Sequence, residues 1–139
     1  IKEKYEASEN GFSLYDVAGK QIFSYKYLGN TIKCKENKII QVKGNIISVD
    51  YQQVSKKLVV LREEKDIRTI AIYEEKGNFI AEINAPMGYR FVSLKNDEGN
   101  IMVVAQGMND ITRDSFGRND WNFSIDLKNY YVEKKSIIQ

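Results

Sequence analysis

Residues 57–73 read KLVVLREEKDIRTIAIY, which is two apolar runs joined by a short polar connection at 63–66. Valine or isoleucine occurs repeatedly in both runs, beside two leucines in the first. Such β-branched side chains lose rotational freedom in a helix but pack well on a pleated sheet. The stretch therefore predicts two neighbouring strands of one meander.

The same pattern extends over the rest of the chain. The sequence holds 17 Ile and 10 Val against 6 Leu and 6 Ala, a balance that favours strands over helices. Gly or Asn separates most of the runs and can supply the positive φ that a tight hairpin needs. We expect strands at 12–16, 21–27, 31–35, 38–43, 46–50, 79–83, 89–94, 101–105, 121–127 and 130–132. The only candidate helix lies at 2–9.

Parts of this pattern repeat. Leu14-Tyr15-Asp16-x-x-Gly19 matches Ile72-Tyr73-Glu74-x-x-Gly77, and residues 37–44 parallel residues 100–107. A weaker third copy begins at Phe123-Ser124-Ile125-Asp126 and echoes residues 12–15. Repeats of this size are typical of propeller blades or stacked meanders.

The turn-and-strand motifs resemble the blades of bacterial β-propellers. The resemblance rests on strand-(Asp/Glu)-x-x-Gly-strand and on Gly-Tyr-x-Phe-x-x-Leu-x-x-Asp-x-Gly-Asn-Ile at 88–101, and it covers most of residues 12–132. The chain has length for about two to three blades, whereas closed propellers have about four to eight, and the WD and Gly-His signatures are missing. We therefore expect a single all-β domain over 1–139. Its hairpins would form an antiparallel meander, arranged as an open partial-propeller-like stack or a two-sheet sandwich.

Composition excludes several functional classes. The chain has no histidine and one cysteine, so it can hold neither a Cys/His zinc site, nor a Ser-His-Asp or Cys-His catalytic group, nor an intramolecular disulfide. Its 21 basic and 19 acidic residues leave a charge of +2, which gives no reason to expect nucleic acid as the partner. No apolar run approaches the roughly 20 residues of a membrane span. We expect a protein without catalytic residues, metal or other cofactor, which does not enter a membrane.

One long irregular stretch, 106–122, stands out as a recognition loop. It contains the only tryptophan and two arginines, the residue types most enriched at interface hot spots. Its aspartates at 110, 114 and 120 lack the close alternating spacing of a calcium loop. The predicted partner-binding residues are Arg113, Asp114, Phe116, Arg118, Asp120 and Trp121. Whether Trp121 lies in the core or at the interface stays open at this stage.

Two further features have structural interpretations. Lysines gather between residues 31 and 65, where they could form a basic patch or protect exposed strands from edge-to-edge aggregation. Cys34 shares the apolar face of an alternating strand with Ile32 and is interpreted as a packing residue.

A small β domain without a catalytic apparatus is most simply a binding protein. Its size and its Ile-, Lys- and Asn-rich composition resemble those of bacterial immunity proteins of contact-dependent growth inhibition systems, which neutralise a cognate toxin. That resemblance implies a cytoplasmic inhibitor that occludes the toxin's active site. The alternatives are a module of a larger propeller-type or cell-surface protein that binds carbohydrate or protein, and a Lys-rich nucleic-acid-binding domain. If an export signal has been trimmed, the location would be periplasmic or at the surface. The oligomeric state is left open.

Overall fold

The computed structural model describes residues 4–8 and 10–138 and confirms the predicted all-β class. Within these residues it contains strands and two short 3₁₀ turns. The strands are β1 Lys4–Ser8, β2 Gly11–Tyr15, β3 Gln21–Leu28, β4 Thr31–Cys34, β5 Ile39–Gln41, β6 Asn45–Gln52, β7 Lys57–Glu64, β8 Ile67–Glu74, β9 Phe79–Asn84, β10 Tyr89–Asp97, β11 Asn100–Gly107, β12 Asp120–Asp126 and β13 Tyr131–Ile137. The 3₁₀ turns are η1 Lys35–Asn37 and η2 Asp110–Thr112.

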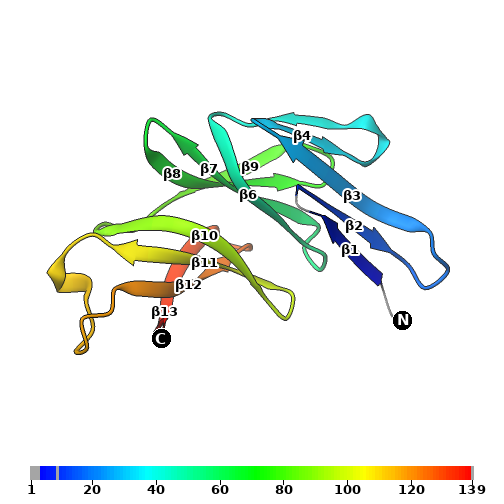
Figure 1. Cartoon of the computed structure of the whole chain (residues 1–139). Coiled ribbons are helices and arrows are strands. Elements are labelled where there is room, and N and C mark those ends of the chain that lie inside the picture. The colour runs from blue at the N-terminus through cyan, green and yellow to red at the C-terminus, as the bar shows by residue number, and fades with distance from the viewer. Residues whose placement is uncertain (1–3, 9, 139) are drawn as a thin grey trace.

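The strands form three antiparallel meanders in chain order. Sheet A contains β1 to β5, sheet B contains β6 to β9, and sheet C contains β10 to β13 (Figure 1). Every strand pairs with its neighbour in sequence, so each sheet is a series of hairpins. Of the two predicted arrangements, the open stack describes the chain, because there are three sheets and not two.

Sheet B is the middle layer, and both of its faces are buried. Along β7, Leu58 and Val60 join a core shared with sheet A, whereas Val59 and Leu61 join a second core shared with sheet C. A strand covered on both faces needs apolar residues at every position rather than at alternate ones. This explains the unbroken run at 58–61.

The two cores differ in character. The core between sheets A and B is rich in aromatic rings, with Phe23 stacked on Tyr51 at 4.3 Å between ring centroids. The hydroxyl of Tyr25 donates a hydrogen bond to the Val49 carbonyl at 3.0 Å, so this phenol is buried with a partner. The core between sheets B and C is mainly aliphatic and includes Phe91 and Phe123.

The first sequence repeat corresponds to a repeated turn. In residues 16–20, Asp16 N–H donates to the Lys20 carbonyl and Gly19 N–H donates to the Asp16 carbonyl. Residues 74–78 repeat both bonds, from Glu74 to Asn78 and from Gly77 to Glu74. The second repeat has no such equivalence, since β5 is the edge strand of sheet A and β11 lies inside sheet C. The sequence similarity between residues 37–44 and 100–107 therefore reflects only shared strand composition and turn residues.

Two expectations from the sequence are wrong. Residues 4–8, part of the candidate helix, form β1 and pair with β2, while residues 2, 3 and 9 lie outside the described residues. The irregular stretch at 106–122 is also shorter than expected, because 106–107 belong to β11 and 120–122 to β12. In both places, pairing with a neighbouring strand overrides a weak local pattern.

We predict that the thiol of Cys34 is unreactive in the folded protein. Cys34 is 4% exposed, and burial raises the pKa of its thiol to about 11, so the reactive thiolate is scarce at neutral pH. Labelling with a thiol-reactive disulfide reagent should be slow in buffer and fast in denaturant. Equal rates in the two conditions would contradict the burial.

We also predict that truncating sheet B lowers stability sharply. Replacing fully buried Leu58 by Ala should reduce the free energy of unfolding by about 2–5 kcal/mol, because it removes apolar contacts and leaves a cavity. The matched control is Leu28→Ala on the exposed face of sheet A, where the change should stay within about 0.5 kcal/mol. Urea unfolding of both variants makes the comparison, and similar losses would argue against the layered core.

Candidate functional site

Residues 108–119 form a loop that projects from the end of sheet C, between β11 and β12 (Figure 1). Backbone hydrogen bonds hold both of its ends. Gly107 N–H donates to the Asn119 carbonyl at 2.8 Å, and Met108 N–H donates to the Gly88 carbonyl at 2.7 Å. The sheet therefore fixes where the loop begins and ends.

Side-chain hydrogen bonds organise the base of the loop. The Asn119 amide donates to the carbonyls of Gly107 at 2.9 Å and Asn109 at 3.1 Å, and its oxygen accepts from the Thr112 hydroxyl at 2.7 Å. The Trp121 indole N–H donates to the Thr112 carbonyl at 3.0 Å. These bonds connect η2 to the two strands that flank the loop.

Gly107 allows the close packing of this network. A Cβ atom on Gly107 would lie 1.9 Å from Asn119 Oδ1 and 2.0 Å from Thr112 Oγ1, far inside van der Waals contact. Glycine is the residue that permits such a close approach of side chains to the backbone.

The tip of the loop repeats the turn found at residues 16–20. Asp114 Oδ1 accepts from the N–H groups of Phe116 at 2.9 Å and Arg118 at 2.8 Å, as Asp16 Oδ1 does from Ala18 and Lys20. The Arg118 guanidinium also donates to Asp114 Oδ2 at 2.7 Å. Desolvation alone would raise the pKa of Asp114, but these hydrogen bonds outweigh it and hold that pKa below its ordinary value.

Arg113 connects the tip to η2. Its Nε donates to Asp110 Oδ1 at 3.0 Å, and its Nη1 donates to the Gly117 carbonyl at 2.7 Å. The 12-residue loop thus forms a frame that is held together by hydrogen bonds between its own residues.

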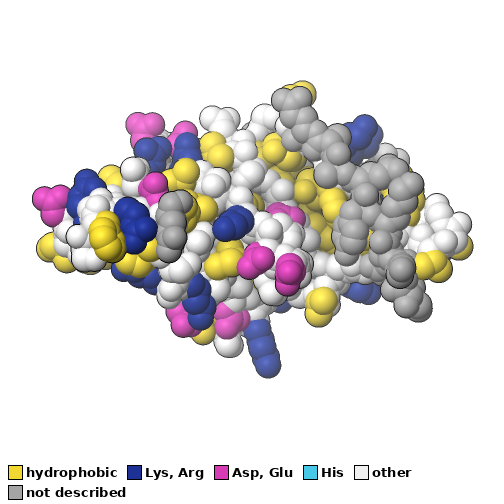
Figure 2. All heavy atoms as spheres, turned by 60° about the horizontal axis from the view of Figure 1, so that its bottom comes forward, with side chains coloured by type: hydrophobic (Ala, Val, Ile, Leu, Met, Phe, Trp, Pro, Cys, Tyr) yellow, Lys and Arg dark blue, Asp and Glu magenta, His cyan; other side chains and the backbone are white. Residues whose placement is uncertain are grey.

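This frame displays three apolar side chains to solvent. Met108 is 62% exposed, Ile111 is 92% exposed and Phe116 is 80% exposed. The Arg118 guanidinium lies 5.0 Å from the Phe116 ring centroid and so supports the ring from one side. Figure 2 shows hydrophobic, basic and acidic side chains mixed at the end of the molecule where Figure 1 places the loop. Exposed apolar groups within a charged surround are typical of binding surfaces.

Some of the predicted site residues expose their side chains to solvent, and others hold the loop in place. Arg113, Asp114, Phe116 and Arg118 come together at the loop tip, where Phe116 is displayed and the other three hold the turn. Asp120 is exposed at the start of β12, and its carbonyl accepts from Ile138 N–H at 2.7 Å.

Trp121 is one of the residues that hold the loop in place. Its ring packs against the core between sheets B and C, and the Lys134 ammonium lies 3.6 Å from the ring centroid. Together with the indole hydrogen bond to Thr112, these contacts make Trp121 the residue that ties the loop to the core. Trp121 is therefore partly buried and joined to the core, and its part in partner binding stays a prediction.

Sequence reasoning missed the displayed Ile111 and Met108. Both are large apolar residues inside an otherwise polar stretch, which was a usable signal. It also missed the supporting pair Asn119 and Thr112, for which the sequence offers no signal because their contact depends on the path of the loop.

The lysines between residues 31 and 65 do not form one face. Lys33 lies on the outer face of sheet A opposite Lys26, and the Lys35 ammonium donates to the Gln21 carbonyl. Lys57 donates to the Leu127 carbonyl at 2.6 Å and to the Tyr130 hydroxyl at 2.8 Å, on sheet C. The sequence cluster is thus distributed over separate surfaces.

Among the described residues, no group of three or more acidic or cysteine side chains is placed so that it could hold a metal ion. A helix of the length and apolar character needed to cross a membrane is not found at residues 4–8 or 10–138.

Comparison of the chain with protein-family models, with curated proteins and with solved structures finds no match.

We predict that Gly107→Ala disorders the loop while leaving the sheets intact. Its backbone conformation allows alanine, so the effect should come from the clash with Asn119 and Thr112. Loss of these hydrogen bonds should cost about 1–3 kcal/mol locally. Hydrogen exchange should accelerate in residues 108–119 but not in β7 and β8. Ser115→Ala, at the exposed tip, is the control that should leave exchange unchanged. A protected loop in the Gly107→Ala variant would show that the frame does not depend on this packing.

Proposed function

We propose that this chain is a non-enzymatic protein-binding domain whose contact surface is the loop at 108–119. The observation that carries the proposal is the display of Met108, Ile111 and Phe116 on a frame whose polar groups already bond to one another. A pre-ordered loop loses little conformational entropy on binding, so apolar contacts convert more fully into affinity.

The charges of the loop favour a protein over a nucleic acid as the partner. Asp110 pairs with Arg113, and Asp114 pairs with Arg118, so the loop carries no net charge. Nucleic-acid binding depends on an excess of cations that neutralise phosphates. Balanced charges beside exposed apolar side chains are consistent with the polar rim and apolar centre of a protein interface.

The absence of an enzymatic role is supported by composition. Histidine is missing from the sequence, and the single thiol, Cys34, is buried in the core between sheets A and B. These facts remove the most common general base and the usable thiol nucleophile.

More specifically, we propose that the chain is a cytoplasmic immunity protein that neutralises a cognate bacterial toxin by covering its active site. Support for this role comes from the size and composition of the chain, and from the hydrogen-bonded loop that projects from the end of sheet C (Figure 1). Charged residues beside the apolar anchors would steer the encounter.

We expect Phe116→Ala and Ile111→Ala each to weaken binding by about thirtyfold or more, as truncation of an interface anchor typically does. Melting temperature should change little, because both side chains are exposed. The substitution at 116 is conformationally mild, since Ala18 already occupies the equivalent position of the matching turn. Val17→Ala is the matched control, because Val17 is an exposed apolar residue on that other turn.

The experiment begins with affinity capture by the tagged wild-type protein in its native host. A protein retained by wild type and by Val17→Ala, but lost with the double variant Ile111→Ala/Phe116→Ala, is then purified for calorimetric titration. If every loop variant binds this partner like wild type, the proposed surface is wrong.

The immunity role is tested by growth. Expression of the partner alone should arrest growth, and co-expression of this chain should restore it. A partner with no effect on growth argues against the immunity role and leaves the binding role standing.

A further inference from the structure

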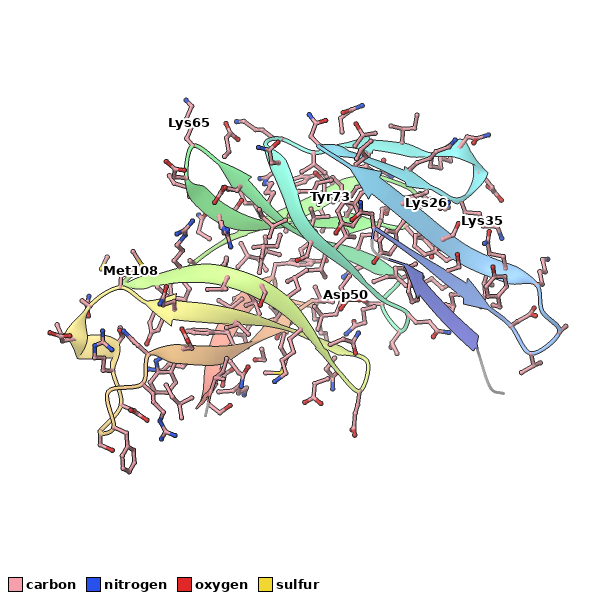
Figure 3. All side chains as sticks on the ribbon, in the orientation of Figure 1. Lys26, Lys35, Asp50, Lys65, Tyr73 and Met108 are labelled. Atoms are coloured by element: carbon pink, nitrogen blue, oxygen red, sulfur yellow. The ribbon has the colours of Figure 1, made fainter. Side chains whose placement is uncertain are left out.

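A cavity of about 330 Å³ lies where sheets B and C meet, beside the start of the loop between β11 and β12. Its lining includes Asp66 on the β7–β8 turn, Arg68 near the start of β8, Arg90 near the start of β10, and Met108. Figure 3 labels Lys65 on the same turn and Met108 at the beginning of the loop, at one end of the molecule. The cavity therefore adjoins the proposed contact surface.

Two arginines converge on one carboxylate oxygen beside this cavity. Glu63 Oε1 accepts from Arg68 Nε at 3.0 Å and from Arg90 Nη2 at 3.2 Å. Glu63 and Arg68 are cross-strand partners on β7 and β8 of sheet B, whereas Arg90 comes from sheet C. These contacts place all three side chains on the same side of sheet B. One carboxylate thus serves two guanidinium groups and balances the charge of only one of them.

The two arginines differ in how much hydrogen-bonding capacity they retain. Arg68 Nη1 also donates to the Val92 carbonyl at 2.9 Å, so this residue joins sheet B to sheet C. The Arg90 side chain is 45% exposed, and its Nε and Nη1 groups have no acceptor among the described residues. Because a guanidinium carries five N–H donors in a planar fork, Arg90 can still bind an incoming acceptor.

The charges around the cavity leave a small positive excess. Four basic and three acidic side chains gather here, namely Lys43, Lys65, Arg68 and Arg90 with Glu63, Glu64 and Asp66. Lys43 lies 4.0 Å from Glu64. Asp66 lines the cavity but takes part in none of the ion pairs among the described residues. The region therefore carries one net positive charge, and the unpaired donors of Arg90 favour an anionic occupant.

The shape and position of the cavity favour a carboxylate that belongs to a protein. The planar fork of arginine matches a carboxylate, which can accept two parallel hydrogen bonds from it. The volume is at the low end of the range for small-ligand sites and suits a single side chain. Met108, which is 62% exposed, supplies an apolar contact for the methylene stem of such a side chain.

We propose that this cavity receives an aspartate or glutamate side chain of the protein that binds the loop, with Arg90 as the hydrogen-bond donor. Arg68 adds a second positive charge, and Glu63 holds both guanidinium groups in position. This inference rests on the proposed function for the source of the carboxylate and deepens it by naming the partner's chemistry. The partner surface would present an acidic residue beside the apolar area that contacts Ile111 and Phe116.

The first test uses a defined probe and needs no partner. The capped peptide Gly-Gly-Glu-Gly-Gly is titrated into the isotope-labelled protein at constant ionic strength and followed by NMR. We expect saturable shifts of the Arg90 side-chain Nε–H and of the amides of Arg68, Arg90 and Met108. Shifts that do not saturate, or equal shifts with the Gln analogue of the peptide, would overturn the proposal. Tighter binding of inorganic phosphate than of the Glu peptide would overturn the assignment to a carboxylate.

Two variants with opposite expected effects assign the site. Arg90→Gln should weaken binding of the Glu peptide at least about fivefold, because it removes the charge-assisted hydrogen bonds. Asp66→Asn should strengthen binding about twofold, because it removes a like charge from the cavity. Asparagine tolerates the positive φ of 64° at position 66, so this variant keeps the turn. Lys65→Gln is the charge-matched control on the same turn, and its affinity should stay within about twofold of wild type.

Unchanged affinity in both Arg90→Gln and Asp66→Asn would show that the cavity does not hold the carboxylate. If Arg90→Gln lowers the melting temperature strongly, Asp66→Asn and the Gln peptide still decide the outcome.

The last comparison uses the purified partner and separates this inference from the proposed function. Calorimetric titrations compare Arg90→Gln with the double variant Ile111→Ala/Phe116→Ala, and we expect both to bind more weakly than wild type. Loss of binding with the double variant alone would overturn this inference and leave the proposed function standing. Loss of binding with Arg90→Gln alone would overturn the proposed apolar surface and support the carboxylate site.

Discussion

The fold depends on the burial of both faces of sheet B. Strands β7 and β8 supply alternate residues to two separate cores, so Leu58 and Val60 serve sheet A while Val59 and Leu61 serve sheet C. Sheets A and C each have only one face covered in this way. Without the middle sheet, each would expose an apolar face to water, which is unfavourable. The middle layer thus turns three local meanders into one stack.

The same local turn serves two purposes in this molecule. At residues 16–20 and 74–78 it joins the strands of a hairpin, and in both hairpins the strand register shifts directly beside the turn. At residues 114–118 it closes the tip of the loop at 108–119, where no strand pair follows directly. The side chain at the third turn position is Ala18 in the first case and Phe116 in the loop. A stable turn with an apolar side chain at an outward position is a simple means of building a contact surface.

The candidate loop depends on sheet C for its position. It presents apolar groups whose supporting charges are already paired, as Arg118 is with Asp114. This arrangement suits a surface that excludes water from an apolar contact. Gly88, just before β10, accepts a hydrogen bond from Met108 N–H and links this strand to the loop.

The sequence by itself determined the fold class, most strand positions and the region of the candidate loop. These features depend on neighbouring residues, because β-branched runs favour extended backbone and an Asp-x-x-Gly segment closes a turn locally. Tertiary structure alone decided that residues 4–8 pair with β2, that Trp121 supports the loop, and that Ile111 faces solvent. It also brought Asp50 beside Asn96, which is 46 residues away in the chain. Such contacts join segments that carry no mutual signal, since the packing of whole sheets determines which side chains meet.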